Sequence, residues 1–238
     1  MRVTHGNSAT QWKQIGDSQS EIQNSPAADK LIPVWEALSV ASSFLIAEWL
    51  VESLVGNYKF FGTIPIGLAF GFIFVSHRIR GETLRDIGFR GDNFLSAIGW
   101  LAPPTVVAVA AILALGWAFN SLDFEELVSR PVYLRLLLWS LAQQYVAQGF
   151  INRRAQLVWG KGWRSVLFVA VLFTLFRLPN IRLCLLAFLG GILWAAVYQR
   201  HPNLPALAIS QAILLLVLAL ALPHEWLNGL RIGLRYLV

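Results

Sequence analysis

Long apolar segments separated by short polar ones dominate the chain. After a polar stretch over residues 1–33, seven apolar segments follow: 34–55, 60–76, 93–119, 132–151, 165–176, 183–199 and 202–223. A membrane-crossing helix needs about 20 mainly apolar residues, and only segment 165–176 falls clearly short of that length. Backbone polar groups inside a bilayer must be paired within the segment, so the segments predict helices. The pattern therefore predicts an all-α fold, a transmembrane bundle of about seven helices.

The same pattern divides the chain into three parts. Residues 1–33 are rich in Gln, Ser and Asn, carry three Lys/Arg against three Asp/Glu, and predict a flexible cytosolic tail without a secretory signal. Residues 34–223 form the predicted bundle, and residues 224–238 form a short C-terminal tail.

Composition strengthens the membrane interpretation. Of the 238 residues, 56% are hydrophobic and 13% are charged, whereas an average soluble domain is about 25% charged. Such a chain is too apolar for a disordered protein and has too little polar surface for a soluble one. The single cysteine, Cys184, excludes an internal disulfide and a cysteine-based metal site.

The net charge of +6 points to lipid rather than nucleic acid. The basic residues lie between apolar segments, so we expect anionic membrane lipids as partners and no nucleic acid. With the N-terminus inside, 12 Lys/Arg lie on the inner side and 7 on the other. The positive-inside rule then predicts an integral protein, of the bacterial cytoplasmic membrane, with a cytosolic N-terminus.

Carboxylates and histidines are arranged unfavourably for catalysis. Residues 127–224 contain no Asp or Glu and nine Lys/Arg, which excludes carboxylate acid–base chemistry there. No two histidines share a helical face at i, i+4, so no zinc site is evident; the histidines are His5, His77, His201 and His224. Glu48 and Glu52 share a face in the first segment, where they either act in a site or face the interior and the headgroups.

Three amides lie close together in the segment QQYVAQGFINRR, residues 143–154. Gln144 and Gln148 are at i, i+4 and predict one helical face, with Gln143 about 100° away. Each amide needs a hydrogen-bond partner inside a membrane. The simplest interpretation is hydrogen bonding between helices, worth about 0.6 kcal/mol for each bond.

This segment resembles the CPBP family, the CAAX-protease and bacteriocin-processing intramembrane metalloproteases. The family carries a string like EELLFRGFI, where this chain has QQYVAQGFI. Gln143 and Gln144 occupy the glutamate positions, Gln148 occupies the arginine position, and Gly149 and Phe150 match.

The resemblance continues downstream and covers roughly residues 80–220. Phe173 matches a family Phe-x-x-x-His, with Arg177 at the histidine position. GGILWAAVYQRHPNL, residues 190–204, fits a glycine-rich helix and its turn. The second family histidine aligns with Gln211, or with Ser210 if the turn is one residue shorter. Upstream, TLRDIGFR at 83–90 resembles a basic linker of the family.

One pair of adjacent glutamates elsewhere in the chain has the spacing of the first family motif. Glu125, Glu126 and Arg130 have its spacing, but they lie 48 residues before Phe173 rather than about thirty, and Pro131 follows them. We therefore interpret them as a polar loop.

The resemblance implies a glutamate that activates water, with help from histidines and usually a metal. Glutamine is no base and a poor metal ligand, and arginine repels a divalent cation. We therefore expect no catalytic residue, no metal ligand and no cofactor. The motif positions would instead line a cavity that binds a membrane peptide or a prenylated or other lipid ligand, as in a pseudoprotease; these positions are Gln143, Gln144, Gln148, Phe173, Arg177 and Gln211.

Two other functions stay open. One is a divergent, zinc-dependent CAAX-type endopeptidase that uses Glu48, Glu52, His77 or His201. The other is a lipid or small-solute transporter, in which Pro103–Pro104 would break the third segment, although no convincing internal repeat supports it. Arg177 itself either faces the cavity or extends to the membrane interface.

Overall fold

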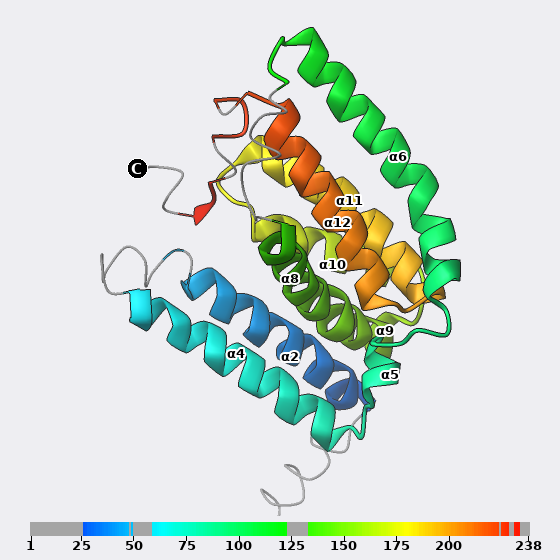
Figure 1. The fold of residues 1–238 in the computed structure, drawn as a ribbon. Helices are drawn as coiled ribbons and strands as arrows, with labels where there is room; N and C mark the ends of the chain where they lie inside the picture. The colour runs from blue at the N-terminus through cyan, green and yellow to red at the C-terminus, as the bar shows by residue number, and fades with distance from the viewer. Residues whose placement is uncertain are drawn as a thin grey trace, which may run out of the picture.

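The computed structural model describes residues 26–47, 49, 59–122, 133–223, 225–228 and 231–233. Within these ranges the chain is helical, with no strand, which confirms the all-α prediction. The helices in Figure 1 are α2 (Pro26–Ile46), α4 (Lys59–Ile79), α5 (Leu84–Ile87), α6 (Phe94–Ala118), α8 (Tyr133–Gln144), the π-helix η2 (Tyr145–Asn152), α9 (Arg153–Trp159), α10 (Trp163–Leu175), α11 (Ile181–Arg200) and α12 (Leu204–Ala221).

Membrane-spanning character is clearest in three helices. α6, α11 and α12 are long and apolar enough to cross a bilayer. α2, α4 and α10 contain shorter apolar stretches. α2 begins at Pro26, so residues 26–33 are helical where we expected a flexible tail; residues 1–25 lie outside the described ranges.

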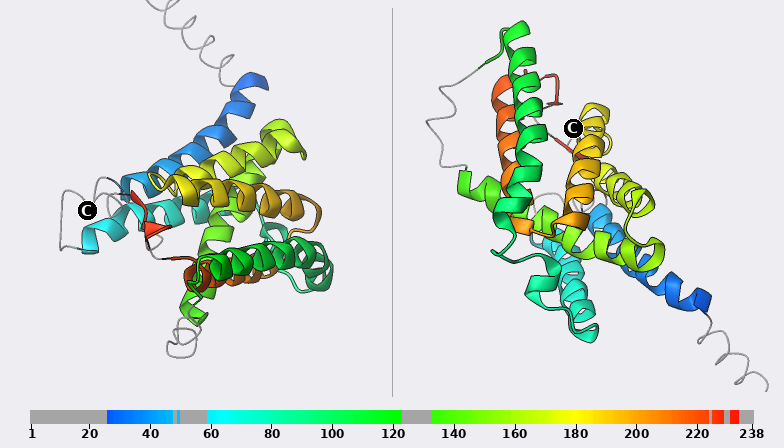
Figure 2. Two further views of the ribbon diagram at one scale, coloured as in Figure 1. Left: turned by 90° about the horizontal axis from the view of Figure 1, so that it is seen from above. Right: turned by 90° about the vertical axis from the view of Figure 1, so that its right-hand side faces the viewer.

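The helices pack around one central rod. α8, η2 and α9 follow one another without a break. α2 pairs with α4 and packs against α9 on one side of the rod, while α6 pairs with α12, which packs along α8. α10 and α11 form the third pair (Figures 1 and 2). The rod is thus the element that touches all three pairs.

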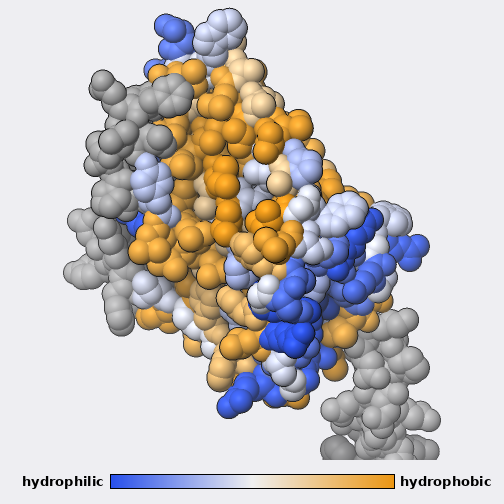
Figure 3. All heavy atoms as spheres, turned by 45° about the vertical axis from the view of Figure 1, so that its right-hand side comes forward, coloured by the Kyte–Doolittle hydropathy of each residue, from blue (hydrophilic) through white to orange (hydrophobic). Residues whose placement is uncertain are grey.

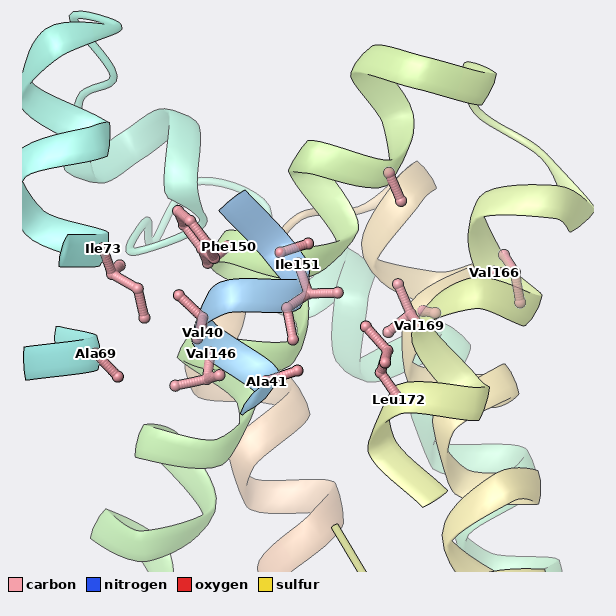
Figure 4. Packing of buried hydrophobic residues seen from close by; sticks show 13 residues of the cluster. Val40, Ala41, Ala69, Ile73, Val146, Phe150, Ile151, Val166, Val169 and Leu172 are labelled. Atoms are coloured by element: carbon pink, nitrogen blue, oxygen red, sulfur yellow. The ribbon is translucent and has the colours of Figure 1, made fainter. Parts of the chain in front are cut away.

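The largest buried apolar cluster joins the rod to its neighbours. It takes residues from α2, α4, η2 and α10, as Figure 4 shows: Val40, Ala41, Ala69, Ile73, Val146, Phe150, Ile151, Val166, Val169 and Leu172. A second cluster lies on the other face of the rod and joins η2 to α5, α6, α11 and α12.

Two glycines allow helices to approach closely. A Cβ on Gly149 would lie 2.9 Å from Cγ2 of Ile87, and one on Gly191 would lie 3.0 Å from Cα of Ala170. Small residues at such contacts are typical of membrane helix packing. Gly191 therefore sets the separation of α10 and α11.

The third predicted segment is one unbroken helix. α6 runs from Phe94 to Ala118 through Pro103 and Pro104, so the break considered for a transporter is absent from this helix. Most of its exposed side chains are apolar, including Leu95, Val107 and Trp117, which suits contact with lipid. In Figure 3 hydrophobic residues cover most of the visible face, and hydrophilic residues gather at the end where α5 lies.

Candidate functional site

Four of the motif positions meet in one hydrogen-bonded cluster. Gln144 Nε2 donates to Gln211 Oε1 at 2.7 Å, which joins the end of α8 to α12. Gln211 Nε2 donates to Gln143 Oε1, and Arg177 Nη2 donates to the same oxygen at 2.7 Å. Gln144 and Gln211 are fully buried. We call Arg177, Gln143, Gln211 and Gln144 the first amide chain.

Arg177 fixes the direction of every bond in this chain. A guanidinium can only donate, so Gln143 must present its oxygen. That oxygen also accepts from Gln211, whose own oxygen then accepts from Gln144. The chain ends at Gln144 Oε1, a buried acceptor with no hydrogen-bond partner among the described residues.

The arginine faces the interior of the bundle. Besides its bond to Gln143, its guanidinium lies 5.2 Å from the ring centroid of Phe173, within the range of a cation–π contact. Phe173 is therefore the fifth motif position in the cluster.

A short helix precedes Arg177. α10 ends at Leu175 after 13 residues, about 20 Å of helix against a hydrocarbon layer of about 30 Å. Non-helical backbone at such depth must be buried in protein. Residues of the C-terminal tail supply this cover, because Gly233 N donates to Leu178 O at 2.8 Å and Asn180 Nδ2 donates to Leu227 O at 2.8 Å.

Gln148 belongs to a second amide chain, with Asn152 and Gln199. Gly162 N donates to Gln199 Oε1 at 2.8 Å, Gln199 Nε2 donates to Asn152 Oδ1 at 3.2 Å, and Asn152 Nδ2 donates to Gln148 Oε1 at 2.8 Å. A backbone N–H fixes the direction here, and the chain ends at Gln148 Nε2, a buried donor without a partner among the described residues.

The six motif positions therefore do not line one cavity: Gln148 lies outside the first amide chain, and neither Gln148 nor Gln144 lines a cavity. The i, i+4 spacing assumed an α-helix, whereas residues 145–152 form a π-helix with i to i+5 bonding. The Gln148 side chain bonds to Asn152, and Asn152 in turn donates to Ala195 O of α11 at 3.3 Å.

Two apolar cavities flank the first amide chain. The smaller, of about 90 Å³, lies among α2, α4 and α8 and reaches Gln143. The larger, of about 310 Å³, lies among α6, α11 and α12 and reaches Gln211. Arg177 and Phe173 line both cavities, whereas Gln144 and Gln148 line neither.

Ser210, the alternative to Gln211, points elsewhere. Its Oγ lies 2.8 Å from Thr105 Oγ1 of α6 and accepts from Trp194 Nε1 of α11 at 3.2 Å. Gln211 alone of the two reaches Gln143 and Gln144.

The sequence did not predict a partly buried ionic cluster around Glu82. Glu82, after α4, accepts from Arg153 Nη2 at 2.7 Å and from Arg154 Nη2 at 3.1 Å, and it contacts His77 Nδ1. Arg154 is fully buried and also pairs with Glu36 Oε2 at 2.6 Å. We call these five residues the Glu82 cluster; it joins α2, α4 and α9.

Electrostatics in this cluster favour the ionised carboxylate. Burial raises the pKa of Glu82, but hydrogen bonds from His77, Arg154 and Arg153 outweigh that effect and hold its pKa well below the usual range. The available signals were Glu36 inside an apolar segment and the adjacent Arg153–Arg154 pair. Neither signal identifies Glu82, the acceptor that both arginines share, which lies in the loop after α4.

The other predicted candidates do not assemble into a site among the described residues. His201 Nδ1 lies 3.1 Å from Ser96 Oγ, and its ring stacks on Trp100. Within the described ranges no three His, Cys, Asp or Glu side chains come close enough to hold a metal ion. Several candidates lie outside these ranges: His5, Glu48, Glu52, Glu125, Glu126, Arg130 and His224.

No family model, curated protein or solved structure matches this chain. The functional interpretation rests on the two amide chains, the cavities and the Glu82 cluster.

Proposed function

We propose that this chain is a noncatalytic membrane protein of CPBP type, which binds a membrane peptide or a lipid ligand beside the first amide chain. Its bundle crosses the bacterial cytoplasmic membrane seven times, with the N-terminus in the cytosol. The observation that carries the proposal is the hydrogen-bonded meeting of Gln143, Gln144, Gln211 and Arg177, contributed by three separate parts of the chain.

The chemistry of these groups suits recognition rather than hydrolysis. Amides and a guanidinium bind carbonyl, carboxylate and phosphate oxygens through directed hydrogen bonds. None of them can take a proton from water near neutral pH, so the cluster has no general base. Two apolar cavities meet at Arg177. The apolar part of a ligand would therefore have space beside the polar groups of the first amide chain.

The zinc ion of active relatives does not fit these residues. Zinc requires three or four thiolate, imidazole or carboxylate ligands. Here the equivalent positions carry amides that are already bonded to one another, and Arg177 brings a fixed positive charge. A dication at this place would be repelled.

Metal analysis beside a peptidase assay tests the noncatalytic assignment. We expect the purified protein to contain no stoichiometric zinc and to leave a prenylated CAAX peptide uncut. The control is Gln144→Ala, which should leave both readings unchanged. Tightly bound zinc at one equivalent per chain, lost in Gln144→Ala, would overturn the proposal.

One contact favours the second candidate, a divergent metalloprotease. His77 and Glu82 are paired within the Glu82 cluster and could supply an imidazole and a carboxylate. Against it, both groups are held by structural partners, since Glu82 accepts from two arginines. The same assays on His77→Ala test it: peptidase activity in the wild-type protein that is abolished by His77→Ala would favour the second candidate.

A further inference from the structure

The walls of the larger cavity are the three helices that are long and apolar enough to cross a bilayer. α6, α11 and α12 supply all of its lining except Phe173 and Arg177, which lie at the end of α10 and in the loop after it. Arg177 and Gln211 are hydrogen-bonded to Gln143, and most of the remaining lining is aliphatic. The free space in this cavity therefore borders mainly on hydrocarbon.

The cavity exists because two consecutive helices diverge. Only residues 201–203 connect α11 to α12, yet the two helices touch little beyond this connection. α12 packs along α6 and α8 instead, and α11 packs along α10. In the right-hand view of Figure 2, α11 and α12 meet at their connection and separate away from it. The space between them is a wedge.

Polar bonds close the narrow end of the wedge. Ser210 of α12 bonds to Thr105 of α6 at 2.8 Å and accepts from Trp194 of α11 at 3.2 Å, so one hydroxyl ties all three helices together. The ring of Trp194 lines the cavity at this end. A molecule inside the wedge could not pass this point without breaking buried hydrogen bonds.

The chain after α12 crosses the wide end of the wedge. Trp226 O accepts from Arg182 of α11 at 2.7 Å, and Leu227 O accepts from Asn180, just before α11, at 2.8 Å. Leu227 also packs in a buried cluster with Ile112 and Leu218, two residues of the cavity lining. Both ends of the wedge are thus covered by protein.

The cavity stays open on the side where α6 faces α11. These two helices touch little. Ala111 and Leu115 of α6 and Leu189 of α11 line the cavity, and all three are exposed on the surface of the bundle. Since both ends are covered, a molecule would enter sideways from the bilayer.

The physical character of this space selects its occupant. An apolar cavity does not hold ordered water, but it does bind apolar guests, because a filled cavity regains the van der Waals contacts that a void loses. A volume of about 310 Å³ is at the low end of the range for small-molecule pockets, about 300–1,000 Å³. A peptide helix is about 10–12 Å wide with its side chains and is too wide for such a space.

We propose that the wedge between α11 and α12 binds one hydrocarbon chain of a bilayer lipid, which enters between α6 and α11. The contacts that hold this chain are apolar, so binding depends on the chain and not on the charge of the head group. The inference rests on the proposed function and selects a lipid over a peptide as the ligand of the same interior.

Photo-crosslinking from inside the bilayer tests the occupant. The wild-type protein is placed in phosphatidylcholine nanodiscs that contain some phosphatidylcholine with a diazirine in one acyl chain, and mass spectrometry locates the crosslinks. We expect crosslinks to Leu218, which lines the cavity and is only 6% exposed, as well as to Ile213, which is 42% exposed and outside the lining. Crosslinks to Ile213 without any to Leu218 would overturn the proposal.

Two neighbouring alanines test the entrance. Ala110 and Ala111 are both exposed on α6, but only Ala111 lines the cavity. Ala111→Trp should block the opening and remove most of the crosslinks to Leu218, while Ala110→Trp should keep them. Crosslinks to Ile213 should be equal in both variants. Equal labelling of Leu218 in the two variants would overturn the proposed route of entry.

Three further probes distinguish other occupants. A diazirine fatty acid and the corresponding fatty alcohol should label Leu218 to a similar extent; labelling by the acid alone would mean a charge-selective site and contradict the proposal. A membrane-spanning polyleucine peptide with a central photo-leucine should label Ile213 and not Leu218, and labelling of Leu218 would mean that the cavity admits a helix. The metal and peptidase assays are independent of these results, so an inactive, zinc-free protein with an unlabelled Leu218 would refute this inference alone.

Discussion

At the scale of single residues, Arg177 sets the donor-to-acceptor direction of the hydrogen bonds in the first amide chain. Its donors force the oxygen of Gln143 toward it, and this orientation is passed on to Gln211 and Gln144. Adjacent glutamines therefore have opposite roles, because Gln143 accepts and Gln144 donates. Two identical substitutions should distinguish them.

We expect Gln143→Glu to be tolerated and Gln144→Glu to be destabilising. A carboxylate at 143 can accept the bonds from Arg177 and Gln211 that the amide oxygen accepts now. A carboxylate at 144 would face the oxygen of Gln211 in a fully buried place and cost about 2–4 kcal/mol, or a Tm lower by about 5–10 °C. Thermal unfolding in detergent measures both; equal losses would show that Arg177 does not orient the chain.

The sequence could locate the members of the first amide chain but not the Glu82 cluster. The local spacing of the motif placed Gln143, Gln144, Arg177 and Gln211 at equivalent positions, and the structure brings them together. The Glu82 cluster depends on contacts of more than 70 residues along the chain, such as Arg154 to Glu82. No local pattern encodes such a contact.

At the scale of elements, the Glu82 cluster ties the end of α4 to α9, with Glu36 of α2 on the same arginine. Hydrogen bonds from His77, Arg154 and Arg153 lower the pKa of Glu82 from its usual value of 4.5. A carboxylate whose pKa is lowered by folding stabilises the fold above that usual value, and the stabilisation is lost as the pH falls through the lowered pKa.

We therefore expect the Tm advantage of the wild-type protein over Glu82→Gln to be full above pH 4.5 and to shrink as the pH falls below it. Thermal unfolding of both proteins across this range measures the difference. An advantage that is constant with pH would show that ionised Glu82 does not hold α4 and α9 together.

The contact between α10 and α11 depends on Gly191. A valine there would push against the backbone of Ala170 and cost about 1–3 kcal/mol through overpacking. Gly71 of α4 is a matched control, since nothing lies within 4 Å of a Cβ placed on it. We expect Gly191→Val to lower the Tm and Gly71→Val to leave it nearly unchanged; equal effects would mean that helix propensity, not packing, decides.

Helix positions were more predictable than helix types. Hydrophobic segments mark where helices lie because the bilayer requires paired backbones. The sequence did not predict the π-helix η2, whose i to i+5 bonding departs from the α-helical period assumed for residues 143–154. The Gln148 side chain bonds to Asn152 and not to the first amide chain.

At the scale of the whole molecule, we expect seven crossings of the membrane, an odd number. The loop after α9 should then lie in the cytosol and the segment after α12 on the other side. Lys161 and Glu225 are exposed residues in these two places, and Cys184 is the only native cysteine.

In a Cys184→Ala background, a membrane-impermeant maleimide should label Glu225→Cys in intact cells. It should label Lys161→Cys only after the membrane is permeabilised. Labelling of both residues from the same side would exclude seven crossings.

The central claim is that the interior holds a ligand at Arg177 and no catalytic metal. Native mass spectrometry of the wild-type protein and Arg177→Gln, released gently from the membrane, reads both parts together. We predict a retained organic adduct on the wild-type protein that is lost or weakened in Arg177→Gln, with no zinc adduct on either. A zinc adduct on the wild-type protein, or an organic adduct equally retained by Arg177→Gln, would contradict the account.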